Sequence, residues 1–359
     1  MKRWIIVWML IVFAVAGCAT ETPTPTSTPE REVEEPQTLR VMTHSSFDIS
    51  EEVVETFESE HNATVQFLDA GDTGQMVSQA ILSKDNPQAD VMYGVDNTFL
   101  SRALGADIFE PYEAENLTNI PENLILDPEH RVSPVDFGDV CLNYDRAALE
   151  EAGVEPPANL EELTEAAYEG MTVVEHPASS SPGLPFLLTT ISVFGEDSYL
   201  DYWERLDENG LLVVDDWSTA YYGEFSGASG SEGTHPIVVS YATSPAAEVY
   251  FSEGALETPP TGAVTAPGTC FRQIEFVGVL RENENPELAR AFVEFALSET
   301  FQEDIPLHMW VYPAHENADL PPVFEDFAVK AEEPATMSPE AIEENRRAWI
   351  DAWTEIVLQ

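Results

Sequence analysis

The amino-acid sequence predicts an α/β protein with two lobes, each built around a parallel β-sheet. The first observation is length, since 359 residues exceed the size at which one hydrophobic core usually stops growing. The second is an alternation of strand-like and helix-like segments, which is typical of a parallel sheet with crossover helices. The third is composition, because 43% hydrophobic residues are enough to build both cores.

The N-terminus has the composition of an export signal. Two basic residues precede an uninterrupted apolar run at residues 4–16, which is too short to span a bilayer as a helix. We therefore expect a signal peptide at residues 1–17. The run ends in Val15-Ala16-Gly17-Cys18, which resembles a lipobox and predicts lipid modification of Cys18. The alternative is an ordinary cleavage site followed by an incidental cysteine.

Residues 18–37 are rich in threonine, proline and glutamate and have no apolar surface to bury. Such a segment is expected to form an extended, disordered stalk. A lipid followed by a stalk places the folded part on the extracellular face of the cell membrane. Because one acyl chain anchors a protein only marginally, a second chain is implied.

The charge balance is strongly acidic, with 66 Asp and Glu against 15 Lys and Arg and a net charge of −51. Nucleic acid is excluded as a partner, because binding it requires a basic patch that replaces counterions. An acidic surface with few lysines resembles that of proteins from extreme halophiles, where salt screens the repulsion. The alternative is a chain that is acidic to suit a cationic ligand.

The first lobe is expected to begin with alternating strands and helices. Strands are predicted from residue 38 and at 63–68 and 89–95, and helices at 50–61 and 73–83. Ligands of parallel sheets bind outside the carboxyl ends of the strands. The residues that follow the first and third strands are therefore site candidates: Ser45, Ser46, Asp96 and Asn97.

The second lobe follows a proline-rich connector. Its strands are predicted at residues 140–144, 171–175, 211–214 and 237–245, and its helices at 159–167 and 184–194. A strand at 271–280 and helices at 286–297 and 338–358 follow in the part of the chain that returns to the first lobe. We expect lobe 1 to comprise residues 38–134 and 269–359, and lobe 2 to comprise residues 135–268. The chain would cross between the lobes near residues 132–139 and 262–268.

Two local patterns point to a binding site. After the strand at 211–214, Trp217 and Tyr221 lie four residues apart, which places both rings on one face of a helix. Aromatic faces attract a cation by roughly 0.5–2 kcal/mol each, although core packing is the alternative role. The serines at 179–181 precede Pro182-Gly183 and a helix, whose free N–H groups suit an anion or a hydroxyl group. A plain helix cap is the alternative there.

Two cysteines remain once Cys18 is assigned to the lipid. Cys141 and Cys270 both lie in strand-like segments, and a pair of cysteines in an extracellular chain predicts a disulfide. Two buried free thiols are the alternative.

Several motifs, taken together and in order, resemble one family. They are Gly94-Val95-Asp96-Asn97, Ser181-Pro182-Gly183-Leu184, Trp217-Ser218-Thr219-Ala220-Tyr221, Ser240-Tyr241-Ala242-Thr243-Ser244-Pro245, and Ile305-Pro306 with Trp310-Val311-Tyr312-Pro313. These motifs are similar to those of the thiamine-binding proteins of ABC transporters, which are bilobed type II solute-binding proteins. The resemblance covers most of residues 38–358. It implies a Venus-flytrap fold, a hinge, and a permease and ATPase as partners.

The resemblance also implies roles for individual residues. Trp217, Tyr221 and Trp310 would form the aromatic walls, and Asp96 would accept from the aminopyrimidine. The hydroxyl or phosphate end of the ligand would face Ser179, Ser180, Ser181, Gly183, Ser240 and Thr243. Tyr241 and Tyr312 would complete the pocket. Where the family has Tyr-Asp-Ser-Phe in its first loop, this chain has His44-Ser45-Ser46-Phe47. The family's tryptophan shortly after this loop is absent here, where residues 48–51 stand instead.

Other functions are weaker interpretations of the sequence. Ferric iron would use Tyr221 and Tyr222 as ligands, but Tyr222 is expected to lie off the ligand face, and no other metal site is predicted. A polyamine would suit aromatic rings and carboxylates. A hydrolase would need a His-Glu-x-x-His or Gly-x-Ser-x-Gly motif in context, and neither occurs. We therefore expect a monomeric binding protein without a cofactor and without catalytic residues.

Overall fold

The computed structural model describes residues 35–358, and the chain from Pro36 onward forms one compact unit. The predicted signal peptide, the lipidation site at Cys18 and almost all of the stalk lie outside the described residues. Within residues 35–358, no helix combines the length and hydropathy required to cross a membrane.

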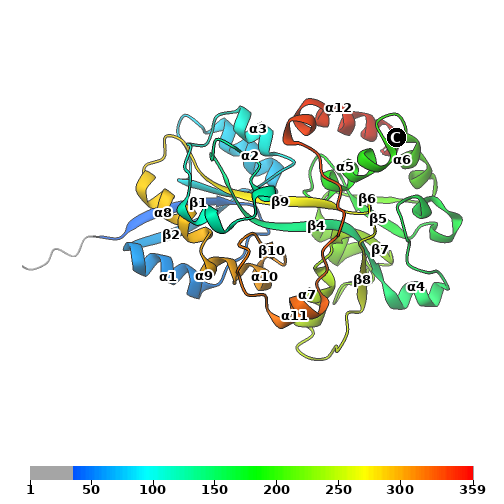
Figure 1. The fold of residues 1–359 in the computed structure, drawn as a ribbon. Helices are drawn as coiled ribbons and strands as arrows, with labels where there is room; N and C mark the ends of the chain where they lie inside the picture. Colours follow the sequence, from blue (N-terminus) through cyan, green and yellow to red (C-terminus); the bar gives the residue numbers. More distant parts are fainter. Residues whose placement is uncertain (1–34, 359) are drawn as a thin grey trace, which may run out of the picture. The chain divides into compact units, whose positions relative to one another are not determined.

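The described residues build a ten-stranded mixed sheet with the order β2-β1-β3-β9-β4-β7-β5-β6, to which β8 and β10 add by pairing with β4 (Figure 1). The strands are β1 (Gln37–Thr43), β2 (Ala63–Asp69), β3 (Val91–Asp96), β4 (Ser133–Asp145), β5 (Thr172–Glu175), β6 (Leu212–Val214), β7 (Ile237–Tyr241), β8 (Thr261–Val264), β9 (Phe271–Val279) and β10 (Tyr312–Pro313). Parallel pairing occurs at both ends of the sheet, as predicted for each lobe, but β4 and β9 pair antiparallel with their neighbours.

We call β2, β1 and β3 with their flanking helices the β1 side of the sheet. Its helices are α1 (Glu51–His61), α2 (Thr73–Leu82), α3 (Leu100–Gly105) and α8 (Pro286–Ala296), followed by the short α9 (Glu299–Gln302) and α10 (Ile305–His308). The helix predicted at 50–61 is confirmed as α1, and the Ser50 hydroxyl caps it by accepting from the N–H of Val53. Phe57 of α1 packs edge-on against Phe292 of α8.

We call β7, β5 and β6 with their flanking elements the β5 side. Its helices are α4 (Arg146–Ala152), α5 (Gly183–Phe194), α6 (Tyr199–Glu208) and α7 (Ser244–Phe251), with a π-helix at Thr219–Glu224. The predicted helix at 159–167 is wrong, since only 3₁₀ turns at Glu161–Thr164 and Ala166–Tyr168 form. The reason is local: Glu165, between the turns, has an extended backbone.

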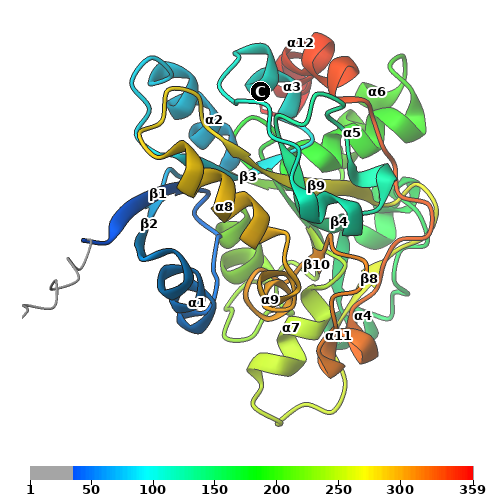
Figure 2. The ribbon, with the colours of Figure 1, turned by 60° about the vertical axis from the view of Figure 1, so that its left-hand side comes forward.

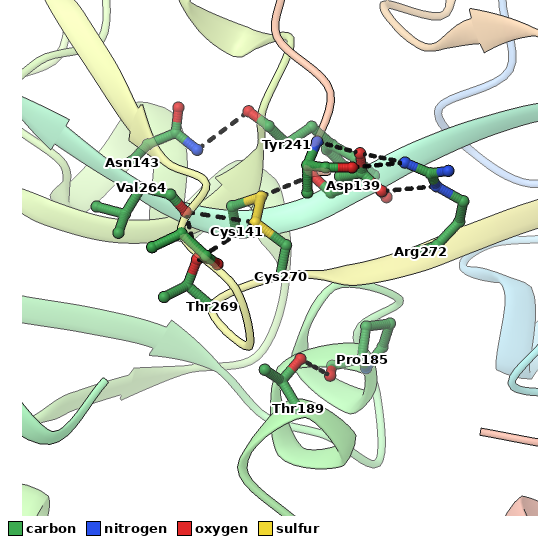
Figure 3. The surroundings of a disulfide bond; sticks show 12 residues. Asp139, Cys141, Asn143, Pro185, Thr189, Tyr241, Val264, Thr269, Cys270 and Arg272 are labelled. Carbon is green, nitrogen blue, oxygen red and sulfur yellow. Dashed lines mark hydrogen bonds and ion pairs between the residues drawn. A yellow bond between two sulfur atoms is a disulfide. The ribbon is translucent and has the colours of Figure 1, made fainter. Parts of the chain in front are cut away.

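Strands β4 and β9 run between the two sides, and a disulfide joins them near the β5 side (Figure 1, Figure 3). Cys141 of β4 is bonded to Cys270, which immediately precedes β9. On the same two strands, the Arg272 guanidinium donates to both oxygens of Asp139 at 2.8 Å. The crossing strands are thus tied by a covalent bond and a bidentate ion pair.

The C-terminal helix α12 (Pro339–Val357) contacts both sides of the sheet (Figure 2). Arg346 lies over the ring of Phe99, which precedes α3, at 4.8 Å. Trp353 packs edge-on against Trp203 of α6 at 5.5 Å. The helix predicted at 338–358 therefore exists, and it spans the junction between the β1 and β5 sides. The remaining helix, α11 (Pro322–Phe327), packs on α7.

Candidate functional site

A cavity of about 650 Å³ opens between the β1 and β5 sides. Its walls come from segments that follow the carboxyl ends of β1, β2, β5, β6 and β7, together with β9 and the stretch after α10. This is the position at which parallel sheets bind ligands. Its lining includes seven predicted site residues: Ser45, Ser46, Ser181, Trp217, Tyr221, Tyr241 and Trp310.

One wall of the cavity is a cluster of three aromatic rings. Trp217 and Tyr221 stack at 5.1 Å between ring centroids, and Tyr222 meets Trp217 edge-on at 5.4 Å. The expectation that Tyr222 points away from the site is wrong, because Tyr222 also lines the cavity. The π-helix at Thr219–Glu224 explains this: i→i+5 bonding widens the turn and brings neighbouring side chains toward one face.

Trp310 carries the second aromatic cluster, with its ring 5.3 Å from Tyr250, 5.2 Å from Phe251 and 5.8 Å from Phe324. Its backbone has φ of +56°, a left-handed conformation that costs a bulky residue roughly 1–3 kcal/mol. The Thr243 hydroxyl donates to the Trp310 carbonyl oxygen at 2.5 Å. A residue of the β5 side thereby holds this tryptophan in its strained conformation.

The predicted hydroxyl residues Ser240 and Thr243 do not line the cavity. Both are completely buried. The Ser240 hydroxyl accepts a hydrogen bond from Nε1 of Trp217 at 2.9 Å. The Thr243 hydroxyl likewise bonds a tryptophan, by donating to the Trp310 carbonyl oxygen. In this structure the two hydroxyls position the tryptophans from the second layer.

The cavity is rich in carboxylates, and the basic side chains that line it among the described residues are the histidines His44 and His308. Asp72, Glu248 and Glu275 line it, and no lysine or arginine of the described residues does. Burial raises the pKa of Asp72, although the N–H groups of Thr73 and Ser181 act in the opposite direction. Burial also raises the pKa of Glu248, which accepts from the Tyr221 hydroxyl at 2.9 Å. Burial thus disfavours the charge on these two carboxyls, and a cation entering the cavity would favour their ionised form and be attracted to it.

His44 occupies the first loop, where the sequence departs from the family pattern. Its Nε2 lies 3.1 Å from Oε2 of Glu275. Burial lowers the pKa of His44, but Glu275, together with the charges of Asp72 and Asp96, acts in the opposite direction, and the net pKa is raised. Gly94 makes room for the ring, since a Cβ there would lie 2.2 Å from the imidazole. His44 and His308 both line the cavity.

Asp96 lies one layer behind the cavity and is completely buried. Its carboxylate accepts from the Ser181 hydroxyl at 3.2 Å and from the N–H of Thr98 at 2.7 Å. Burial raises the pKa of Asp96 to about 6, with the charge of Glu275 acting in the same direction. Asp96 therefore reaches the cavity through Ser181, which itself comes from the β5 side.

The remaining predicted residues lie away from the cavity. Asn97 donates to the Arg272 carbonyl, Ser179 donates to the Asp215 carbonyl, and Tyr312 stacks on Phe137. Ser180 is buried, with no hydrogen-bond partner for its hydroxyl among the described residues. Gly183 allows the first turn of α5 to approach the backbone of Glu175, because a Cβ there would lie 2.7 Å from that carbonyl oxygen.

Sequence reasoning missed the three carboxylates. Asp72 follows the carboxyl end of β2 and caps α2, so the rule that selected residues after β1 and β3 would have selected it too. Glu275 is a charged residue within the buried strand β9, which is itself a signal. Glu248 lies within α7, and no sequence signal identifies it.

The geometry provides little for a metal ion. Within residues 35–358, no group of three or more His, Cys, Asp or Glu side chains is arranged to hold one. The Tyr221 hydroxyl donates to Glu248, and burial together with that carboxylate raises its pKa well above the usual value. Burial raises the pKa of Tyr222 as well. The tyrosine pair is thus held as neutral phenols rather than phenolates.

Comparisons with known proteins agree with this geometry. The thiamine-binding periplasmic protein of Escherichia coli K12 is 30% identical over 320 residues, which cover 85% of this chain and 88% of that protein. The protein of the same name from Brucella suis biovar 1 is 29% identical over 322 residues, or 88% and 91% of the two chains. A solved periplasmic thiamin binding protein aligns with a TM-score of 0.77 and 26% identity, covering 91% of this chain and 98% of that one.

Iron-binding proteins share the fold as well. The apo ferric ion-binding protein A of Pasteurella haemolytica aligns with a TM-score of 0.70 at 15% identity, covering 89% of this chain and 98% of that one. This likeness shows the type II periplasmic-binding-protein fold alone. Residues 86–336 match the family described as bacterial extracellular solute-binding protein. The chain belongs to this family of solute-binding proteins, which are not enzymes.

Proposed function

We propose that this protein captures thiamine or a thiamine phosphate and delivers it to the permease of an ABC transporter. The observation that carries the proposal is that one cavity combines aromatic walls with the carboxylates of Asp72, Glu248 and Glu275. Of the described residues, no lysine or arginine lines this cavity. Thiamine has a permanently charged thiazolium and a flat aminopyrimidine, and both suit such walls. The thiamine-binding relatives support the same ligand.

In this proposal, the β1 and β5 sides act as two lobes that close on the ligand. Trp217, Tyr221 and Trp310 would enclose its rings, with Tyr241 completing the pocket. Ser45, Ser46 and Ser181 would supply hydroxyl groups, and Asp96 would act on the ligand through Ser181. The closed form would then dock onto the permease and ATPase complex.

The N-terminal sequence supports a further proposal about location. An extracytoplasmic position follows from the family, and Cys18 would attach the chain to the outer face of the cell membrane through lipid.

The net charge of −51 supports a halophilic, archaeal source. We propose that the protein acts as a monomer.

The test is a titration of the purified protein with thiamine in molar KCl, in which tryptophan fluorescence reports binding. We expect saturable quenching, a loss of affinity of roughly tenfold or more in Trp217→Ala, and a smaller loss in Asp72→Asn. Glu208→Gln is the matched control, because Glu208 is an exposed carboxylate at the end of α6.

Spermidine and ferric citrate are titrated in parallel. Saturation by spermidine without a response to thiamine would assign the cavity to a polyamine, whose ammonium groups the three carboxylates could also bind. A visible tyrosinate–iron colour without a response to thiamine would assign the site to iron, with Tyr221 and Tyr222 as ligands.

A further inference from the structure

A second groove, of about 710 Å³, lies where α2, α3, the loop before α5 and α12 meet. Two arginines, Arg102 and Arg346, line this groove. No aspartate or glutamate lines it, although 66 of the 359 residues are acidic. The groove therefore has the opposite charge to the central cavity, which is lined by carboxylates and by no lysine or arginine of the described residues.

The two arginines lack the partners that most arginines of this chain have. Arg131, Arg205, Arg272 and Arg290 each form an ion pair with a carboxylate. Neither Arg102 nor Arg346 has a carboxylate within ion-pair distance in the part of the chain that the structure describes. One N–H of Arg102 donates to the Ser78 hydroxyl at 3.0 Å, and the Arg346 guanidinium lies over the Phe99 ring.

The two guanidinium groups repel each other. Burial lowers the pKa of Arg346, and the charge of Arg102 lowers it further, while the charges of Glu343 and Asp96 act in the opposite direction. A guanidinium has five N–H donors in a planar fork, so most donors of this pair are left to bind something else. An oxyanion between the two groups would remove the repulsion and accept several of these hydrogen bonds.

We propose that this groove binds a small oxyanion, of the phosphate or sulfate type, between Arg102 and Arg346. The remaining walls supply neutral polar side chains, among them Gln75, Gln79 and Gln88. A planar guanidinium fork matches two oxygens of an oxyanion better than it matches a spherical halide. The site should therefore retain selectivity for phosphate in the presence of chloride.

The groove and the central cavity share their walls. Helix α2 faces the cavity with Thr73 and the groove with Gln75, while the loop before α5 supplies Ser181 to the cavity and Ser179 to the groove. The Ser181 and Thr73 hydroxyls are 3.2 Å apart, so the two segments already touch. An anion in the groove would hold the same segments together and favour the arrangement that encloses the cavity.

Calorimetric titration of the purified protein with inorganic phosphate tests the site directly. In molar KCl at constant ionic strength, we expect saturable one-to-one binding, with sulfate competing. Arg102→Ala and Arg346→Ala should each weaken phosphate binding by about tenfold or more, because each removes charge-assisted hydrogen bonds. Absence of saturable heat with both anions would overturn the proposal.

Arg347→Ala is the matched control, since Arg347 is the next residue of the same helix, is almost fully exposed and pairs with Asp351. It loses the same charge and should bind phosphate within about twofold of the unaltered protein. If Arg346→Ala and Arg347→Ala weaken phosphate binding equally, the effect comes from the overall charge of the protein, and the proposed site is refuted. If Arg346→Ala does not fold, as judged by circular dichroism, Arg346→Lys serves instead, because it keeps the charge but not the fork.

The coupling between the two sites rests on the proposed function and is measured separately. With phosphate present, thiamine affinity should rise by about fivefold or more, and this gain should disappear in Arg346→Ala. Phosphate binding without any change in thiamine affinity would refute the coupling and keep the anion site. Phosphate binding in a protein that does not bind thiamine would refute the proposed function alone.

Discussion

The indole N–H of Trp217 donates to the hydroxyl of Ser240 at 2.9 Å, which joins the segment after β6 to the end of β7. Ser240 is completely buried and also lies 2.9 Å from the Ser244 hydroxyl. This chain of hydrogen bonds fixes the plane of the ring that stacks on Tyr221. A residue that does not reach the cavity thus determines the shape of its aromatic wall.

Ser240→Ala should weaken ligand binding without unfolding the protein. Losing one neutral hydrogen bond of about 1 kcal/mol corresponds to roughly a fivefold loss of thiamine affinity if the indole is misoriented. The measurements are fluorescence titration and the near-ultraviolet circular dichroism of the tryptophans. Ser226→Ala is the control, because its hydroxyl binds Asp145 outside the cavity. Unchanged affinity in Ser240→Ala would argue against a positioning role.

Thr243→Val should lower both stability and ligand affinity. The substitution keeps the shape but leaves the Trp310 carbonyl without its donor, at a residue whose φ is +56°. We expect the free energy of unfolding to fall by about 1–2 kcal/mol. The matched control is Thr269→Val, whose buried hydroxyl donates to Val264 and Ala266. Urea denaturation should show similar losses in both variants, while only Thr243→Val should weaken thiamine binding.

Reducing the disulfide between Cys141 and Cys270 should destabilise the protein substantially. The two cysteines are 129 positions apart, and closing so long a loop constrains the unfolded chain by about 4–5 kcal/mol in the entropic treatment. Urea unfolding with and without reductant measures the difference. The double variant Cys141→Ser, Cys270→Ser should match the reduced protein and show no further response to reductant. A response that persists in this variant would point to another cause.

Stability should fall as pH rises between about 4 and 6, with Asp96 as a main contributor. Its folded-state pKa is raised to about 6 from an ordinary value of 3.8, so the folded protein binds a proton that the unfolded chain has already released. At roughly 1.4 kcal/mol per pKa unit, the loss is about 2–3 kcal/mol once pH exceeds 6. Asp96→Asn should flatten this slope, as measured by denaturation at several pH values. An identical slope in both proteins would contradict the assignment.

Thermal stability should rise as KCl is added. With a net charge of −51, the folded chain repels itself, and salt screens this repulsion within a Debye length of about 10 Å at 0.1 M. Calorimetry across a series of KCl concentrations measures the midpoint of unfolding. A neutral osmolyte at matched osmolality should give a smaller increase. Unfolding that is independent of KCl would argue against adaptation to high salt.

Local patterns predicted most elements because their causes are local. The helices predicted at 50–61 and 338–358 lie where the sequence placed them, as α1 and α12. The helix expected at 159–167 does not form, because the local residue pattern does not show that Glu165 adopts an extended backbone. Likewise, the spacing of Trp217 and Tyr221 predicted one shared face, but not the π-helix that adds Tyr222 to it.

The candidate site could be predicted only in part. Residues next to strand ends, such as Ser45 and Ser181, line the cavity, because the carboxyl ends of parallel strands meet at one edge. Ser240 and Thr243 were selected by the same logic, but they turn inward to hold Trp217 and Trp310. The choice between facing a ligand and supporting a neighbour depends on what packs opposite.

By itself, the sequence determined the α/β class, the parallel strand–helix units and the aromatic and polar residues at the strand ends, because periodicity and turn chemistry act over a few residues. Only the tertiary structure decided that β4 and β9 pair antiparallel with their neighbours, and that Asp72, Glu248 and Glu275 converge on one cavity. It also decided that Arg102 and Arg346, 244 positions apart in the chain, share one groove. Such contacts depend on long-range packing, which no local pattern records.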